Sequence, residues 1–283
     1  MKVSSECIPC VLRQVIRTAR IASEGDEWLE RKILNEIMAE LSTSGHDIPP
    51  TPAELTFLCH QKASRILGMQ DAYLEERKEM VQQTLALESK MRELVEKEDQ
   101  PILAAALLAT ALCTFEDLLD KNRNLEIILQ RGLMEGFVHS DFEEFLKDLE
   151  TAKTILYLLG SSGELVGDKI FLEHIEENRE ITLVVRKEPI IADATLEDVE
   201  LAGLDHYSII HPGHEMRGIT LEQTSKDFRQ KFEEADLVIA KGQAHYETLS
   251  ASERVAYYMI RPKCDYMAGQ LGVKVYDLVF LKE

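Results

Sequence analysis

The spacing of apolar residues along the chain changes about halfway along it. In the first half, apolar residues recur every three to four positions, which is the spacing of one face of an α-helix. Segments 10–22, 27–42 and 71–97 follow this pattern, and segment 101–119 is apolar on nearly every side, as expected of a central buried helix. The pattern predicts a helical N-terminal part over residues 1–150.

In the second half, short apolar runs rich in β-branched and aromatic residues alternate with segments of helical spacing. The runs lie at residues 154–159, 181–186, 206–211, 236–241, 255–260 and 273–281. Strands that alternate with helices form a mostly parallel sheet with helices on both faces, and ligands bind at the carboxyl ends of its strands. We therefore predict an α/β protein whose helical N-terminal part packs on a Rossmann-like C-terminal layer, residues 151–283.

The formal net charge of the 283-residue chain is −19. Binding to nucleic acid needs clustered Lys and Arg, so nucleic acid is not expected as a partner. No apolar run reaches the roughly 18 residues of a membrane-spanning helix, and the first residues lack a signal-peptide pattern. We expect a cytoplasmic protein without a membrane partner, and its oligomeric state stays open. Phosphorylated substrates would need a local cation, a metal ion or a Lys, to offset the acidic field.

A turn of small residues follows the first predicted strand. In the stretch YLLGSSGELVGDKIF, residues 157–171, the apolar run stops at Gly160 and a helical pattern follows. Free N–H groups and the dipole at a helix start attract anions. Residues 160–164 are therefore a candidate anion site, although they match neither the phosphate-loop nor the dinucleotide pattern. A tight turn with a serine N-cap is the alternative.

Two more loops follow predicted strands. Asp193 ends the short apolar run of PIIADATLED, where a carboxylate can hold Mg²⁺ or a similar hard cation. A helix cap in the same stretch is the alternative interpretation. Lys241 ends another strand, where its ammonium group can reach a phosphate as a point charge. His245 is a candidate hydrogen-bond donor or metal ligand, with surface solvation as the alternative.

The chain contains five cysteines, and without an export signal reduced thiols are the default. Cys7 and Cys10 form a Cys-x-x-Cys pair, and with Cys59 and Cys264 they are candidates for a tetrahedral zinc site. A redox pair and plain buried thiols are the alternatives. Cys113 lies in an apolar helical run and is expected to be a buried thiol.

Several blocks of this sequence, taken in order, resemble the damage-control phosphatases. This family shares the acidic-residue-methyltransferase-like metal-binding domain, and the likeness is to its stand-alone prokaryotic form. The blocks are ECIPCVLRQ, GMQDAYLEERK, ILYLLGSSGELVGDKIFLE, PIIADATLEDVELAGL, ADLVIAKGQAHYETL and KCDYMAGQLGV. The resemblance covers nearly the whole chain. It implies a helical part on a Rossmann-like part, with a divalent metal ion (Mn²⁺, Co²⁺, Ni²⁺ or Mg²⁺) that assists hydrolysis of phosphorylated metabolites such as sugar phosphates.

The resemblance also assigns roles to single residues. Asp193 matches a metal ligand and Lys241 matches a phosphate-facing lysine, which makes both of them candidate catalytic residues. Gly160 and Ser161 stand where the family usually has an Asp and an Asn that bind the metal, so Ser161 is the candidate second ligand. Ala192 also replaces a usual Asn. The candidate phosphate-binding residues are Ser161, Ser162, Gly163, Glu164, Lys241 and His245.

Three functions follow from these patterns. The first is a divalent-metal-dependent phosphomonoester hydrolase. The second is a catalytically impaired relative that binds a phosphorylated metabolite or another anion without turnover, which the small residues at Gly160 and Ser161 favour. The third is a zinc or redox protein centred on Cys7 and Cys10.

Overall fold

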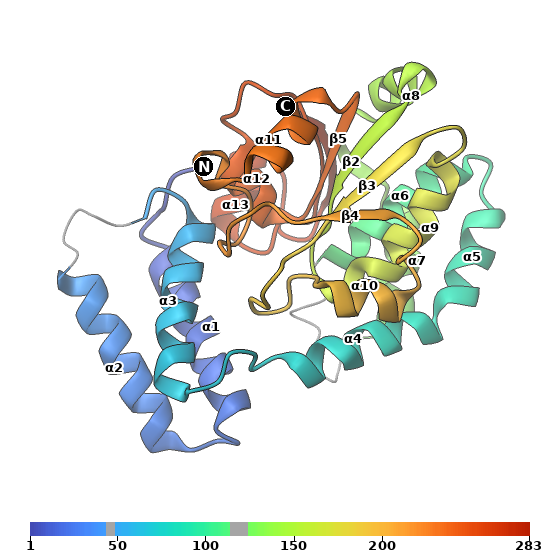
Figure 1. The fold of residues 1–283 in the computed structure, drawn as a ribbon. Helices are drawn as coiled ribbons and strands as arrows, with labels where there is room; N and C mark the ends of the chain where they lie inside the picture. The colour runs from blue at the N-terminus through green and yellow to red at the C-terminus, as the bar shows by residue number, and fades with distance from the viewer. Residues whose placement is uncertain (44–48, 114–123) are drawn as a thin grey trace.

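The computed structural model describes residues 1–43, 49–113 and 124–283. Within these residues, a seven-stranded sheet has the order β1-β7-β6-β5-β2-β3-β4 (Figure 1). All neighbouring strands are parallel except β6 and β7. The predicted α/β class with a mostly parallel sheet is confirmed. The strands are β1 (Phe137–Ser140), β2 (Thr154–Leu158), β3 (Glu180–Val184), β4 (Ser208–Ile210), β5 (Leu237–Lys241), β6 (Tyr257–Ile260) and β7 (Leu278–Lys282).

Helices cover both faces of this sheet. One face packs against α4 (Leu74–Ala86), α5 (Glu88–Glu96), α6 (Pro101–Ala111), α7 (Leu125–Glu135), α8 (Phe142–Thr151), α9 (Leu165–Ile175) and α10 (Leu196–Ala202). The other face packs against α11 (Lys226–Glu234), α12 (Gln243–Leu249) and α13 (Asp265–Leu271). The core on the α6 side contains residues from before and after position 150 in the sequence. The predicted boundary between residues 1–150 and 151–283 therefore does not separate two cores.

The apolar character of the strands follows from this double cover. In β2, Ile155 and Tyr157 belong to the core on the α6 side, whereas Leu156 and Leu158 belong to the core on the α11 side. Successive side chains of a strand point to opposite faces, so a strand buried on both faces must be apolar at nearly every position. This is the signal by which the sequence predicts β2.

Three helices form a separate unit with its own small core. They are α1 (Cys7–Ala22), α2 (Glu27–Thr43) and α3 (Pro52–Leu67). Figure 1 shows this unit beside the sheet, on the side of α12 and α13, with α4 leading away from it. Thr51 and Glu54 form a capping box that fixes the start of α3.

Two elements differ from the sequence prediction. The single helix expected over 71–97 is two helices, α4 and α5, which meet at Leu87. There the Leu87 N–H donates to the carbonyl of Thr84 (3.0 Å), three residues back, which tightens the backbone and ends α4. Strand β1 was not predicted, because a short and mostly exposed edge strand has no apolar alternation.

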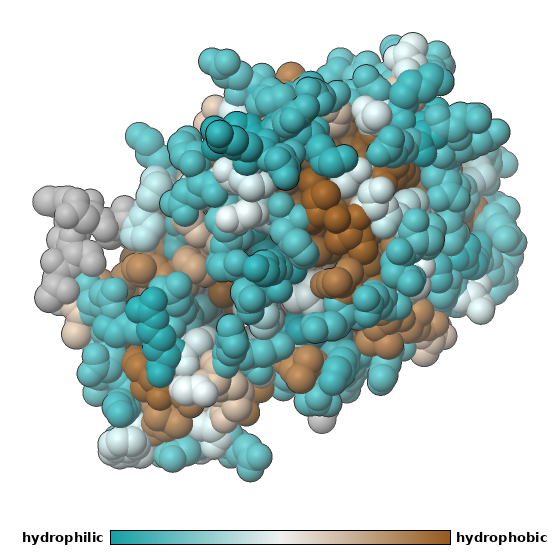
Figure 2. Space-filling model, viewed as in Figure 1, coloured by the Kyte–Doolittle hydropathy of each residue, from teal (hydrophilic) through white to brown (hydrophobic). Residues whose placement is uncertain are grey.

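The surface is largely hydrophilic on the face shown in Figure 2, with apolar residues gathered near the edge strand β4. Among the described residues, no helix has the length and apolarity needed to cross a membrane.

Candidate functional site

A cleft of about 1140 Å³ lies between the α1–α3 unit and the carboxyl ends of the central strands. Gly160 and Ser161 line it after β2, and Lys241 lines it at the end of β5. The chain leaves β2 for β3 on one side of the sheet, whereas β5 lies on the other side of β2. Such a reversal of strand order opens a crevice in α/β sheets, which explains the position of the cleft.

The turn after β2 is held together from within. The N–H and the hydroxyl of Ser161 both donate to Oε1 of Glu164 (3.1 and 2.8 Å), and the Ser162 N–H donates to the carbonyl of Ala192 (2.8 Å). The Glu164 N–H donates to the carbonyl of Ser161 (3.0 Å). The expectation of several exposed N–H groups on this turn is therefore wrong for these three residues. Their donors are used to shape the turn.

The loop that carries Asp193 lies directly beside this turn. Ser161 and Asp193 pair through a short antiparallel backbone bridge, and the Ala194 N–H donates to the carbonyl of Gly160 (2.9 Å). The structure thus brings together two residues that the sequence predicted at one edge of the sheet.

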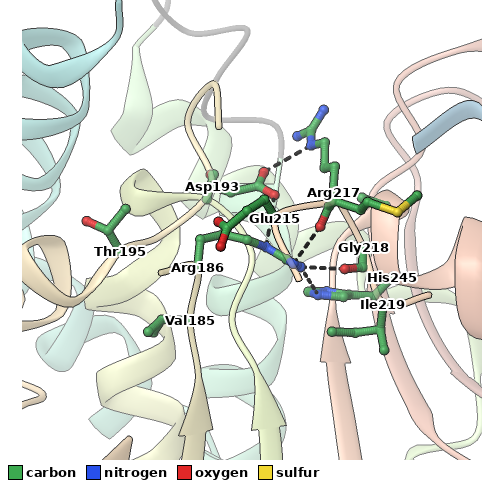
Figure 3. Close-up of polar contacts among 12 residues, drawn as sticks. Val185, Arg186, Asp193, Thr195, Glu215, Arg217, Gly218, Ile219 and His245 are labelled. Atoms are coloured by element: carbon green, nitrogen blue, oxygen red, sulfur yellow. Dashed lines mark hydrogen bonds and ion pairs between the residues drawn. The ribbon is translucent and has the colours of Figure 1, made fainter. Parts of the chain in front are cut away.

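Two guanidinium groups hold the carboxylate of Asp193 (Figure 3). Nε of Arg217 donates to Oδ1 (3.0 Å), and Nε of Arg186 lies 3.6 Å from Oδ2. Arg186 is buried and also donates to the carbonyls of Met216 (2.7 Å) and Gly218 (2.6 Å). Both oxygens of Asp193 therefore face positive charge that the protein itself supplies.

The side chain of Lys241 points to the face of the sheet that α6 and α9 cover. Its neighbour Ala240 faces the α11 side, so alternation turns Lys241 toward α6 and α9. There Nζ donates to Asp168 Oδ1 (2.6 Å) and to the carbonyl of Ala109 (2.8 Å), and it lies 3.5 Å from Glu164 Oε2. Burial by itself lowers the pKa of Lys241, but the neighbouring carboxylates raise it above its ordinary value. Lys241 is charged and already paired.

His245 lines the cleft as a neutral imidazole. Its Nδ1 lies 2.8 Å from the carbonyl of Lys241, and its Nε2 lies 3.4 Å from a guanidinium nitrogen of Arg186. A carbonyl only accepts and a guanidinium only donates, so we assign the proton to Nδ1. Burial, followed by the charge of Arg186, lowers the pKa of His245 to about 3. With Nε2 facing Arg186, His245 is not placed to bind a metal ion.

The buried His245 predicts a pH-dependent loss of stability. Its pKa is about 3 in the folded protein against 6.5 in the unfolded chain, so between these values only the unfolded chain gains a proton. Stability is complete above pH 6.5 and falls below it, with a loss from His245 of about 2 kcal/mol at pH 5. Urea unfolding at pH 7.5 and pH 5 measures this. In His245→Gln the loss of stability between pH 7.5 and pH 5 should be smaller than in the wild type by about 2 kcal/mol. An equal loss in both proteins would contradict a buried, neutral His245.

Ser162 turns away from the cleft, and neither it nor Gly163 lines it. The Ser162 hydroxyl lies within hydrogen-bond distance of Oδ2 of Asp198 (2.9 Å), which also accepts from Nε of Arg77 (3.0 Å). Sequence reasoning missed Arg77, because a single Arg in an amphipathic helix carries no signal of its distant partner. Arg186 and Arg217, which lie outside the helices, were missed because a single Arg there gives no such signal either.

The cysteines do not form the predicted zinc site in the part of the chain that the structure describes. No group of three His, Cys, Asp or Glu side chains there is close enough to hold a metal ion. Cys7, Cys10, Cys113 and Cys264 line the cleft, and the five cysteines, all among the described residues, form no disulfide. Burial raises the pKa of Cys7, and it raises that of Cys59 to about 11, the opposite of an activated thiolate. Cys113 is buried, as expected.

The described residues also do not fit the divalent metal ion that the resemblance implies. Gly160 offers no ligand, and a Cβ atom built there would lie 2.7 Å from Glu164 Oε2, because that carboxylate fills the adjacent space. The Ser161 hydroxyl is bonded to Glu164, and Asp193 faces two guanidinium groups. Divalent metals need several oxygen ligands that are not already committed.

The sequence of this chain matches the model of the Damage-control phosphatase ARMT1-like domain over residues 3–279. It is 32% identical to a damage-control phosphatase of Archaeoglobus fulgidus over an alignment of 290 positions, which covers 99% of this chain and 98% of that protein. It is 30% identical to an uncharacterised protein of Methanocaldococcus jannaschii over an alignment of 293 positions, which covers 100% of this chain and 96% of that protein.

A solved structure resembles the fold over its full length. The crystal structure of a DUF89 family protein of Pyrococcus horikoshii matches with a TM-score of 0.83 at 28% sequence identity. The match covers 100% of this chain and 99% of that one. The likeness therefore spans both the helical unit and the sheet.

Proposed function

This chain belongs to the damage-control phosphatase ARMT1-like family, and from that premise we propose that its cleft hydrolyses phosphomonoesters of small metabolites, such as sugar phosphates. The family supports a phosphatase-like function for the chain. Because the described residues do not fit the metal ion of this kind of phosphatase, the proposal contains no metal-dependent step.

The observation that carries the proposal is the charge of the cleft. The chain is strongly acidic, yet six basic side chains line the cleft beside five acidic ones. Arg13 and Arg17 lie one helical turn apart on α1, and Arg217 and Lys263 lie on loops that follow strands. Positive groups in a cleft attract anions even when the whole protein repels them. Its volume of about 1140 Å³ accommodates a small phosphorylated metabolite with water.

Phosphate release from a panel of sugar phosphates and nucleotides tests this function. The assay is run with EDTA and with Mg²⁺, Mn²⁺, Co²⁺ and Ni²⁺ in turn. We expect release that falls at least about tenfold in Asp193→Asn, because the neutral amide weakens its hold on two guanidinium groups at the cleft. Asp205→Asn, at an exposed loop position, is the matched control and should leave release unchanged. Equal release from both variants would contradict a role for Asp193.

A second candidate function is binding of the phosphorylated metabolite without turnover. It is favoured by the internal pairing of the candidate catalytic groups, since Asp193 faces Arg186 and Arg217 while Lys241 is held by Asp168. Calorimetric titration of the same protein with the same panel distinguishes the two functions. Heat of binding without phosphate release under any metal condition would identify a binding protein.

A further inference from the structure

We propose that Arg217 supplies the fixed positive charge of this cleft in place of a divalent metal ion, so that the cleft binds phosphate without metal. The inference rests on the proposed function, because it concerns the phosphoryl group that the cleft receives.

The guanidinium group of Arg217 lies at the cleft, next to Asp193. Arg217 lines the cleft, and its side chain is 13% exposed. Its Nε lies 3.0 Å from Oδ1 of Asp193, the carboxylate that the family resemblance assigns to the metal. A cation of the protein therefore already occupies the coordination space of that oxygen (Figure 3). A second, divalent cation at the same oxygen would be repelled at short range.

The backbone on both sides of Arg217 is held in place by Arg186. The buried guanidinium of Arg186 bonds the carbonyls of Met216 and Gly218, the two residues that flank Arg217. Gly218 has a φ of +72°, and a Cβ atom there would lie 2.6 Å from the carbonyl oxygen of Ala244. The chain therefore passes closely over α12 in a conformation that favours glycine. This clamp fixes the backbone at Arg217, and the bond to Asp193 orients its guanidinium group.

On the side of the cleft opposite Arg217, the carboxylate of Glu164 also lies close to a cation of the chain. The Glu164 carboxylate fills the space next to Gly160, and it faces Lys241 Nζ at 3.5 Å. Asp193 thus faces two cations of the chain, whereas Glu164 and Asp168 share one, Lys241. Metal ligation by Asp193 would require breaking its pairs with Arg186 and Arg217.

The chemistry of the guanidinium group suits the role. It remains charged at every physiological pH, and the planar N–H donors of a guanidinium group match two oxygens of a phosphate. Charge-assisted bonds of this kind are short and directional. The ligand class that follows is a phosphate or phosphomonoester, bound with equal affinity in the presence of a chelator.

Two measurements on the full chain test this inference. Calorimetry with inorganic phosphate is done in EDTA and again in Mn²⁺, and Mn²⁺ alone is titrated and followed by electron paramagnetic resonance. We expect the same phosphate affinity in both buffers and no stoichiometric Mn²⁺ site. Arg217→Ala should weaken phosphate binding at least about tenfold, and Arg217→Lys, which keeps the charge but not the planar donors, should weaken it less. Arg131→Ala, 66% exposed on α7, is the matched control and should bind as the wild type does.

The outcomes separate the inference from the proposed function. Phosphate binding that requires Mn²⁺ and survives Arg217→Ala would overturn the inference and leave the function standing. Absence of phosphate binding in both buffers would count against the function as well. The comparison of buffers uses the wild-type protein alone, so it decides the question even if Arg217→Ala fails to fold.

Discussion

Lys241→Met is expected to lower the free energy of unfolding by about 3–5 kcal/mol. In the folded protein the Lys241 ammonium is fully buried between the Asp168 carboxylate (2.6 Å) and the carbonyl of Ala109 (2.8 Å). Met preserves much of the side-chain volume but removes the charge. The Asp168 carboxylate would then be buried without its cation. An uncompensated buried charge of this kind strongly destabilises the folded state.

Urea unfolding followed by circular dichroism measures this loss. Lys78→Met is the matched control, because Lys78 is 47% exposed and pairs with Glu75 at 3.3 Å on the surface of α4. A surface pair of this kind contributes about 0.2–1 kcal/mol. The double variant Lys241→Met with Asp168→Leu should recover part of the loss, because it removes the unpaired charge. A loss in Lys241→Met no larger than that of the control would contradict the buried pair.

Arg77→Met is expected to lower the free energy of unfolding by a similar amount, about 3–5 kcal/mol. It is also expected to weaken phosphate binding in the cleft. Arg77 on α4 is 1% exposed and pairs with Asp198 (3.0 Å) and Asp71 (2.8 Å). Oδ2 of Asp198 also lies within hydrogen-bond distance of the hydroxyls of Ser162 (2.9 Å) and Thr195 (2.8 Å). This one carboxylate thus connects α4 to both loops that meet at the cleft.

Two readouts separate the effects of Arg77→Met. Urea unfolding reports the buried charge left on Asp198, and calorimetry with inorganic phosphate reports the alignment of the two loops. Arg131→Met, whose partner is the surface residue Glu135, is the control for both and should change neither by much. Unchanged phosphate affinity in a destabilised Arg77→Met protein would show that the loops hold their alignment without this network.

Sequence patterns predict the elements of the sheet because a strand buried on both faces must be apolar throughout. That rule identifies β2 and β5 and places the loops that follow them at one edge of the sheet. It fails for β1, an exposed edge strand, and for the break at Leu87, where a shift in one backbone hydrogen bond leaves the apolar spacing intact. The family resemblance likewise follows from the order of these blocks, which covers nearly the whole chain.

The sequence by itself determined that Ser161, Asp193 and Lys241 lie near the cleft, since Ser161 follows β2, Asp193 lies in the loop after β3 and Lys241 ends β5. Only the tertiary structure decided which charges meet. Asp193 faces Arg217, and Lys241 turns inward to Asp168. The physical reason is that strand and helix periodicity are set by neighbours along the chain. The partner of a charge depends on the packing of distant segments, and on which face of a strand its side chain takes.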